Sequence, residues 1–255
     1  MKTDLKKLNS LLSPGASVYV GGSCAEPRGL LETIQAHCQG SSGVHYTQFP
    51  LGAVNQRDLT RITPDASMSV FFMTPYIQDS FKEGRVNFIP MHMRTAFDYL
   101  RTTKLDVALL QAARDRNGAL RYGPNVDFLD AVLANAKHII VEENNSFVAP
   151  IGTKLVDTLQ VDLLLDVGRE KPVFPVGDID DVSNKIGEQI ATLIKDGDCL
   201  QTGIGAVPAA ILANLGERSD LGFHGGLMDD GVLALIRNGN MNGSRKAIDK
   251  GKHIL

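Results

Sequence analysis

A cysteine that could act as a nucleophile stands in a glycine-rich stretch, residues 21–27 (GGSCAEP). A short apolar run precedes this stretch, and helical periodicity follows it. A thiolate at the start of a helix is favoured by the helix dipole, and it can accept an acyl group from a thioester. Cys24 is therefore a candidate catalytic residue. The alternative is a small buried side chain that fills a turn, a common use of free cysteine.

A pair of carboxylates offers a second kind of chemistry. Glu142 and Glu143 follow the apolar residues 139–141, and open α/β sheets bind ligands at the carboxyl ends of their strands. One carboxylate there could act as a general base on water or as a nucleophile. Glu142 is thus a second catalytic candidate, and the alternative is a polar loop behind a strand.

Glycines and a histidine near the carboxyl end of the chain suit an anion or an oxyanion. Gly203 and Gly205 permit positive φ angles and close backbone approach, and the helix expected after them offers free N–H groups. His224, followed by two glycines, could do acid–base work or form a structural hydrogen bond. A tight turn between a strand and a helix is the alternative for the two glycines.

The elements that must position these residues alternate between strands and helices. This order predicts an α/β fold with an open, mainly parallel sheet and flanking helices. The polar segment 168–181 predicts a linker, which gives domains at residues 1–177 and 178–255. Strands are expected at residues 18–20, 44–49, 69–73, 107–110, 137–141 and 163–167, and helices at 28–37, 127–136 and 186–194.

Composition excludes several classes of protein. With 43% hydrophobic and 22% charged residues, the chain is neither disordered nor fibrous. A net charge of -3 without a basic patch argues against nucleic-acid binding. Three cysteines without C-x-x-C spacing indicate neither disulfides nor structural zinc, so we expect a cytoplasmic protein. No apolar run is long enough to span a membrane, and no metal site is indicated.

One longer string is specific for a family. Residues 196–231 read DGDCLQTGIGAVPAAILANLGERSDLGFHGGLMDDG. This string resembles the acetyl-CoA hydrolase/transferase branch of the class I CoA-transferase superfamily, which includes 4-hydroxybutyrate and butyrate:acetate CoA-transferases. There, a stretch like DGxxLQxGIGAxPxAxL is followed by LGxHTEMxxDG. Weaker similarity runs upstream, through residues 87–93 and 105–118.

The resemblance implies a fold of two related open α/β domains. It implies coenzyme A as a substrate or ligand, with no tightly bound cofactor. The amides of Gly203 and Gly205 would lie against the thioester carbonyl or a CoA phosphate, with Gly225 and Gly226 in the facing loop. The family also has a segment of glutamate, any residue and asparagine, which assigns Asn144 to substrate binding.

Two departures from the family pattern stand out. The transferases use the glutamate of HTEM as a nucleophile, but this sequence has HGGL, which places Gly226 at that position. The second domain is also considerably shorter than in the family. A companion subunit, a shortened chain or a reduced domain would each explain this, and we expect a second subunit or a homo-oligomer.

These observations predict an enzyme or enzyme subunit that transfers or hydrolyses the acyl group of acyl-CoA or of an acyl-carrier thioester. The first alternative is a non-catalytic subunit that binds CoA or scaffolds a complex. A third possibility is a relative of sugar-phosphate isomerases or translation factors, which share the wider fold and would bind a phosphosugar.

Overall fold

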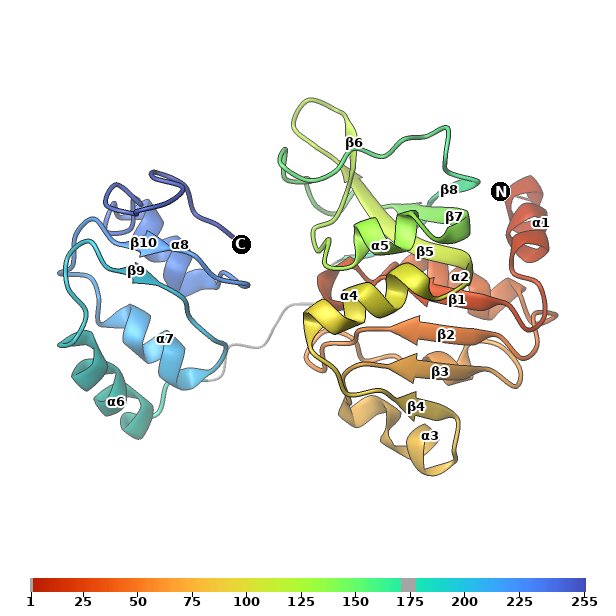
Figure 1. Cartoon of the computed structure of the whole chain (residues 1–255), viewed down its shortest axis with the longest axis horizontal. Helices are drawn as coiled ribbons and strands as arrows, with labels where there is room; N and C mark the ends of the chain where they lie inside the picture. Colours follow the sequence, from red (N-terminus) through yellow and green to blue (C-terminus); the bar gives the residue numbers. More distant parts are fainter. Residues whose placement is uncertain (1, 171–177) are drawn as a thin grey trace. The chain divides into compact units, whose positions relative to one another are not determined.

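The computed structural model describes residues 2–170 and 178–255. The chain divides into two compact units, Met1–Phe174 and Pro175–Leu255, and each is described by itself (Figure 1). The predicted domain boundary, between residues 177 and 178, borders the segment 171–177. That segment lies outside the described residues, so the boundary stays a prediction.

The first unit is built on a sheet with the predicted open, mainly parallel arrangement. The strands run in the order β4-β3-β2-β1-β5-β7-β8, all neighbours in this path are parallel, and β6 pairs antiparallel with β5. This confirms the predicted fold class. The strands are β1 (Ser17–Val20), β2 (His45–Gln48), β3 (Ser67–Val70), β4 (Val86–Phe88), β5 (Leu105–Arg114), β6 (Leu120–Tyr122), β7 (Ala136–Glu143) and β8 (Leu163–Asp166).

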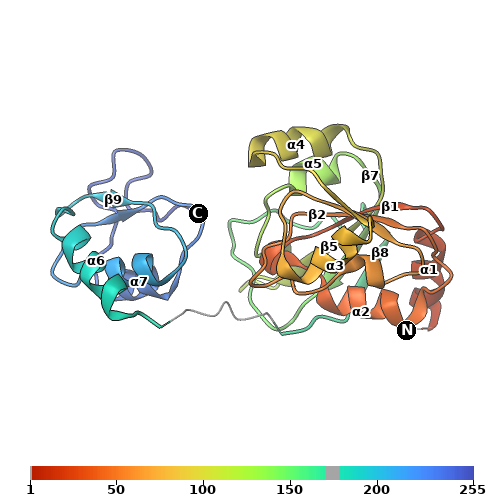
Figure 2. The same cartoon turned by 90° about the horizontal axis from the view of Figure 1, so that it is seen from below.

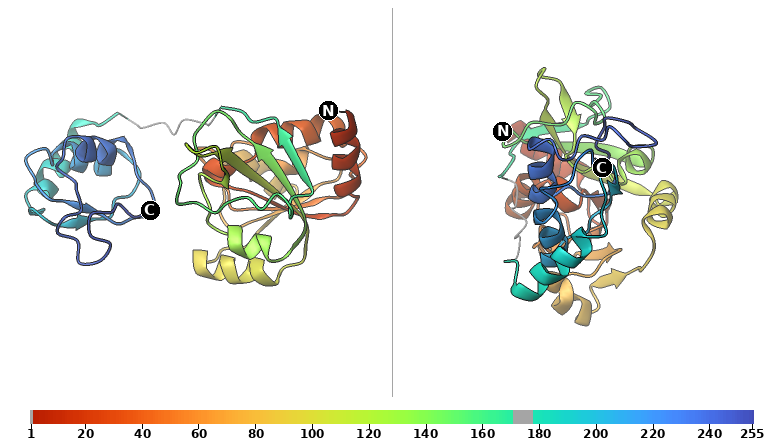
Figure 3. Two further views of the ribbon diagram at one scale, coloured as in Figure 1. Left: turned by 90° about the horizontal axis from the view of Figure 1, so that it is seen from above. Right: turned by 90° about the vertical axis from the view of Figure 1, so that its left-hand side faces the viewer.

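Helices cover both faces of this sheet (Figures 2 and 3). Helices α1 and α2 contribute to the hydrophobic cluster on one face, and α4 and α5 to the cluster on the other. The helices are α1 (Lys2–Leu11), α2 (Arg28–His37), α3 (Gln78–Lys82), α4 (Met93–Thr102) and α5 (Leu129–Leu133), with 3₁₀ turns η1 (Ser23–Ala25), η2 (Leu59–Arg61) and η3 (Pro75–Ile77).

The alternation of side chains along β1 shows why the central strands are apolar throughout. Val18 and Val20 belong to the cluster under α1 and α2, whereas Tyr19 belongs to the cluster under α4 and α5. Successive side chains of a strand point to opposite faces, so a strand covered on both faces is a continuous hydrophobic run.

Several predicted bounds were wrong. Strand β3 lies at Ser67–Val70 rather than at 69–73, and α5 is limited to Leu129–Leu133. Strand β7 continues through Glu143 because its last residues pair with both β5 and β8. Glu142 and Glu143 therefore lie within the strand, not in a loop behind it.

The second unit places two short parallel strands against helices. The helix α6 begins five residues earlier than predicted, because Asp180 caps it by accepting a hydrogen bond from the Ser183 N–H at 2.6 Å. Gly187 allows α6 to touch α7, since a Cβ there would lie 2.7 Å from the Ala210 carbonyl carbon. The elements are α6 (Asp181–Ala191), β9 (Cys199–Leu200), α7 (Ala206–Ala213), β10 (Gly222–Phe223) and α8 (Asp230–Arg237).

Candidate functional site

The carboxyl edge of the first unit's sheet contains a topological switch point. From β1 the chain proceeds to β2 on one side, while β5 pairs with β1 on the other side. Open α/β sheets bind ligands at such points. A hollow of about 400 Å³, part of it open to solvent, lies here. Its lining includes glycine backbone, polar groups and four aromatic rings: Gly21, Gly22, Gln111, Asn125, Asp127, Tyr19, Phe49, Tyr122 and Phe128.

The turn after β1 is tightly constrained. A Cβ on Gly22 would lie 2.0 Å from the Phe49 carbonyl oxygen, so only glycine fits at this position. Ser23 adopts a left-handed conformation with φ +51, which is unusual outside glycine. Asn55 holds it there, accepting from the Ser23 N–H at 2.8 Å and donating to the Ser23 carbonyl at 3.0 Å. The turn therefore has a fixed conformation.

Cys24 lies in this turn, half-buried, within η1. Its carbonyl oxygen accepts a hydrogen bond from Gln111 Nε2 at 3.2 Å. The hollow is lined by Gly22 and Ala25, on either side of Cys24, but not by Cys24. The sequence prediction therefore placed Cys24 in the right turn, and its role as a nucleophile stays a prediction.

Glu142 is fully buried at the carboxyl end of β7. Its Oε2 accepts from the Leu30 N–H at 2.8 Å, in the first turn of α2, where a carboxylate is stabilised by the helix dipole. Only glycine fits at position 29, in the same turn, because a Cβ there would lie 1.7 Å from the Val167 carbonyl oxygen. This geometry favours a structural role for Glu142. The start of α2, whose dipole was expected to favour the Cys24 thiolate, is thus already in contact with the carboxyl group of Glu142.

Asn144 is also buried, and its amide is used within the protein. Its Nδ2 donates to Gln111 Oε1 at 2.7 Å and to the Arg169 carbonyl at 2.8 Å, while its Oδ1 accepts from the Ser146 N–H at 2.9 Å. Gln111 thus connects Asn144 to the Cys24 turn. Sequence reasoning missed Gln111, although a glutamine at the end of the apolar run VALL was a signal.

Glu26 is a second residue that sequence reasoning missed. It is 5% exposed, and its Oε2 accepts from Gln48 Nε2 at 3.0 Å and from Asn55 Nδ2 at 2.9 Å. Burial raises the pKa of the Glu26 carboxyl. The available signal was an acidic residue directly before Pro27 in a turn between apolar elements.

In the second unit, the two glycine loops lie at the same edge of the small sheet. Strands β9 and β10 are parallel, so the loops that follow them are neighbours, and the His224 N–H donates to the Leu200 carbonyl at 2.9 Å. A Cβ on Gly225 would lie 3.5 Å from Gln201 Cγ. The structure therefore brings the loop of Gly203 next to the loop of His224.

The predicted glycines differ in how they are constrained. Gly205 precedes α7 with φ +128, a conformation that favours glycine. Gly203 and Gly226 are exposed, and a Cβ on either would meet nothing within 4 Å. Gly225 is confined by the Phe223 ring, whose Cζ would lie 2.9 Å from an added Cβ. These loops leave space at the start of α7, and the binding roles stay predictions.

Within residues 2–170 and 178–255, no three histidine, cysteine or acidic side chains are grouped so that they could hold a metal ion. None of the helices there has the length and apolar character needed to cross a membrane.

Together, the switch-point hollow and the glycine loops define an open α/β protein of the CoA-transferase type. Residues 3–162 match the family model described as the acetyl-CoA hydrolase/transferase N-terminal domain. The chain belongs to this family, as the motif at residues 196–231 predicted.

Several relatives of the chain are CoA-transferases. The 4-hydroxybutyrate coenzyme A transferase of Clostridium kluyveri is 28% identical over 190 residues, which are 73% of this chain and 44% of the relative. The butyryl-CoA:acetate CoA-transferase of Anaerostipes caccae is 30% identical over 179 residues, 66% of this chain and 40% of the relative. This chain therefore spans about half the length of these relatives or less.

Solved structures show the same fold. RipA from Yersinia pestis superposes with a TM-score of 0.84 at 25% identity, covering 98% of this chain and 61% of that one. A 4-hydroxybutyrate CoA-transferase from Porphyromonas gingivalis gives a TM-score of 0.74 at 25% identity, with 98% and 60% coverage. These matches agree with the α/β architecture described above.

Proposed function

We propose that this chain is an enzyme, or a subunit of one, that transfers or hydrolyses the acyl group of an acyl-CoA or acyl-carrier thioester. The observation that carries the proposal is the placement of the family motif. Its two glycine loops follow paired parallel strands, so Gly203, Gly205 and His224 are at one edge of the small sheet. The first backbone N–H groups of α7 have no acceptor within the helix.

In the proposed reaction, the amides around Gly203 and Gly205 stabilise the negative charge that develops on the thioester carbonyl oxygen. Gly225 and Gly226 leave room for the pantetheine arm of the substrate. In hydrolysis, His224 acts as a general base that takes a proton from the attacking water, and the CoA sulfur leaves as a thiolate. CoA enters as a substrate or ligand, and no tightly bound cofactor is required.

The switch-point hollow of the first unit is proposed, by itself, as a binding site for an apolar group. Its aromatic lining, including Phe49 and Phe128, suits an apolar chain better than a charged one. Asn144 supports this hollow indirectly, because it orients Gln111, which lines it. Cys24 remains the candidate for a covalent route, in which its thiolate accepts the acyl group and releases CoA.

We also propose that the chain works with a second subunit or as a homo-oligomer. Its proposed location is the cytoplasm, because three cysteines without paired spacing suit a reducing compartment.

A second function is favoured by a specific observation. Gly226 stands where the family motif carries a glutamate, and Glu142, at the carboxyl end of β7, is fully buried and accepts from the Leu30 N–H. A chain without a usable carboxylate could bind CoA, or scaffold an active subunit, without catalysing the reaction.

The test is incubation of the chain with radiolabelled butyryl-CoA, with and without acetate and a candidate companion subunit. With the label in the butyryl group, we expect labelled butyrate in both reactions and unlabelled acetyl-CoA only in transfer to acetate, and a loss of at least about tenfold in rate for His224→Asn. Cys24→Ala separates the covalent route, with Cys199→Ala, an exposed cysteine, as its control. CoA binding without turnover under every condition would favour the non-catalytic function.

A further inference from the structure

A second hollow in the first unit has charged walls. It encloses about 490 Å³, part of it open to solvent, beside the start of α2. Its lining consists of Glu26, Arg28, Val54, Gln56 and Arg57. The family motif does not include it, and it shares no lining residue with the aromatic switch-point hollow. It therefore needs an explanation of its own.

Glu26 is the buried acidic residue in this lining. Both amide donors, Gln48 Nε2 and Asn55 Nδ2, reach the same oxygen, Oε2, at 3.0 and 2.9 Å. Among the described residues, no hydrogen bond ends on Oε1. A carboxylate oxygen and the carbonyl oxygen of a neutral acid can each accept two N–H groups, so these bonds fix the orientation of the Glu26 carboxyl. Burial raises the pKa of Glu26, which favours the neutral form.

The rim carries two guanidinium groups that do not pair with this carboxyl. Arg28 Nη1 donates to the Glu170 carbonyl at 3.3 Å, and Arg57 Nη2 lies 3.4 Å from Glu32 Oε1. Both charges act on Glu26, because both lower its pKa against the larger effect of burial.

Positive charge is in excess around this hollow. Glu32 also binds Arg169, at 2.9 Å, so one carboxylate serves two guanidinium groups. Arg28, meanwhile, meets only a neutral carbonyl oxygen among the described residues. The lining of this hollow thus contains two guanidinium groups and one carboxyl, that of Glu26.

We propose that this hollow binds an oxyanion, a phosphate or carboxylate group, through the guanidinium groups of Arg28 and Arg57. Guanidinium forks match both groups, and hydrogen bonds to charged partners are the strong ones. The site depends on the proposed function only for the source of the anion. CoA would supply a phosphate, and an acceptor acid would supply a carboxylate.

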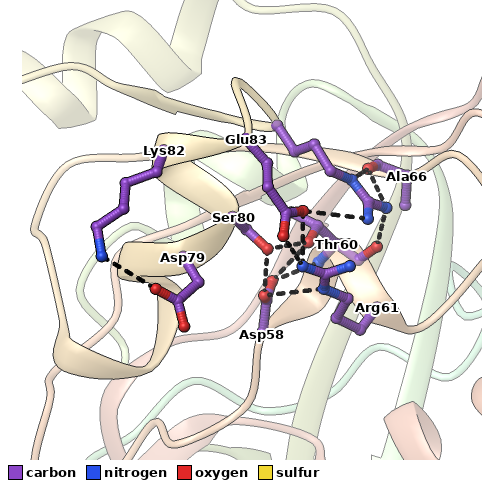
Figure 4. Close-up of polar contacts among 9 residues, drawn as sticks. Asp58, Thr60, Arg61, Ala66, Asp79, Ser80, Lys82 and Glu83 are labelled. Atoms are coloured by element: carbon purple, nitrogen blue, oxygen red, sulfur yellow. Dashed lines mark hydrogen bonds and ion pairs between the residues drawn. The ribbon is translucent and has the colours of Figure 1, made fainter.

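The first experiment measures binding of inorganic phosphate and of butyrate to the full chain by titration calorimetry. Arg28→Gln and Arg57→Gln should each weaken the binding of the preferred anion about tenfold. The matched control is Arg61→Gln, because Arg61 is also an exposed arginine beside a hollow but already binds Glu83 at 2.7 and 2.6 Å (Figure 4). Equal weakening in the control, or no binding of either anion, would overturn the proposal.

The second experiment tests the neutral acid. Glu26→Gln keeps the oxygen that accepts from Gln48 and Asn55 but cannot ionise. Affinity of the wild type should fall as pH rises and Glu26 ionises, whereas the variant should keep a flat profile over the range in which the probe's own charge is constant. The charged groups that act on Glu26 are Arg28 and Arg57, and Glu32 pairs with Arg57. Parallel profiles would remove Glu26 from the site.

The third experiment separates the two sources. CoA should compete with phosphate if the source is the nucleotide, and pantetheine, which lacks phosphate groups, should not. Competition by butyrate but not by CoA would assign the hollow to an acceptor acid. Acyl-transfer activity is measured separately, so an inactive chain that still binds phosphate through Arg28 would reject the proposed function and retain the site.

Discussion

Two clusters of arginine and carboxylate in the first unit use the same residue types in opposite ways. Near the amino ends of β3 and β4, Arg61 and Glu83 form a direct ion pair at 2.6 Å, with Asp58 3.6 Å from Arg61 (Figure 4). At the carboxyl edge, Glu26 meets amides, and Arg28 and Arg57 remain apart from it.

Burial explains the difference. Glu83 and Arg61 are about half exposed, with side-chain exposures of 46% and 49%, so water stabilises their charges and pairing costs little. Glu26 is 5% exposed, and an ionised carboxylate there would lose most of its hydration. The amino-edge carboxylate thus pairs directly with arginine, whereas at the carboxyl edge Arg57 contacts Glu32 and Gln35 rather than Glu26.

The largest effect is expected from Asn55→Ala, which removes the centre of the carboxyl-edge cluster. Asn55 Oδ1 accepts from the N–H groups of Ser23 and Leu51, and its Nδ2 donates to Ser23 and Glu26. Leaving these partners unsatisfied should lower the free energy of unfolding by about 3 kcal/mol. Urea denaturation followed by circular dichroism measures it.

The matched variant at the amino edge is Ser80→Ala. Ser80 is equally buried but holds only two side-chain partners, Asp58 at 2.5 Å and Thr60 at 2.9 Å. We expect a loss of about 1 kcal/mol. If both substitutions lower the free energy of unfolding equally, the carboxyl-edge network is no more constrained than the amino-edge cluster.

A smaller effect is expected from pH. The pKa of Glu26 is raised in the folded state, so its contribution to stability is full below the ordinary value of 4.5 and is lost as pH rises through the folded pKa. The free energy of unfolding of Glu26→Gln should therefore increase relative to that of the wild type as pH rises. Urea midpoints measured between about pH 4 and pH 8 would show the trend.

Asp115 provides the control of opposite sign. Arg121 lowers the pKa of the Asp115 carboxyl through a hydrogen bond at 2.6 Å. Its contribution is present above the ordinary value of 3.8 and is lost as pH falls. Asp115→Asn should therefore lose stability relative to the wild type as pH rises from about 2 to 5. Trends of the same sign in both variants would contradict a neutral Glu26.

The sequence was informative wherever one local pattern determined the structure. The apolar run Val18–Val20, a glycine turn and the spacing of Leu30, Leu31 and Ile34 predicted a strand, a turn and a helix, and α2 has the predicted bounds, Arg28–His37. The family motif of residues 196–231 could also be recognised without the structure, because its glycines stand in the same order as in the family pattern.

Contacts between distant segments could not be predicted in this way. Glu26 meets Gln48 and Asn55, which are 22 and 29 residues away, and no local pattern encodes that distance. The role of Glu142 depended on whether β7 ended before or after it. Pairing with β5 and β8 extends the strand through Glu143, and strand alternation then turns Glu142 toward α2 and Glu143 toward Arg114.

The smallest expected effect would convert one cluster into the other. Glu83→Gln removes the carboxylate that neutralises Arg61, while Asp58 remains 3.6 Å away. The freed guanidinium should acquire weak phosphate binding, in the millimolar range, because a single exposed arginine gains little from an ion pair in water. Calorimetric titration of Glu83→Gln carrying Arg28→Gln isolates this new site from the carboxyl-edge hollow.

The control is the same variant with Arg61→Gln added, which should abolish the new binding. Phosphate binding that survives the loss of Arg61 would place the anion on Arg85, which is 3.9 Å from Glu83 and donates to the Ala66 carbonyl. No binding in the Glu83→Gln variant would mean that unpaired arginines are insufficient. The buried carboxyl of Glu26, rather than the excess of positive charge, would then distinguish the two clusters.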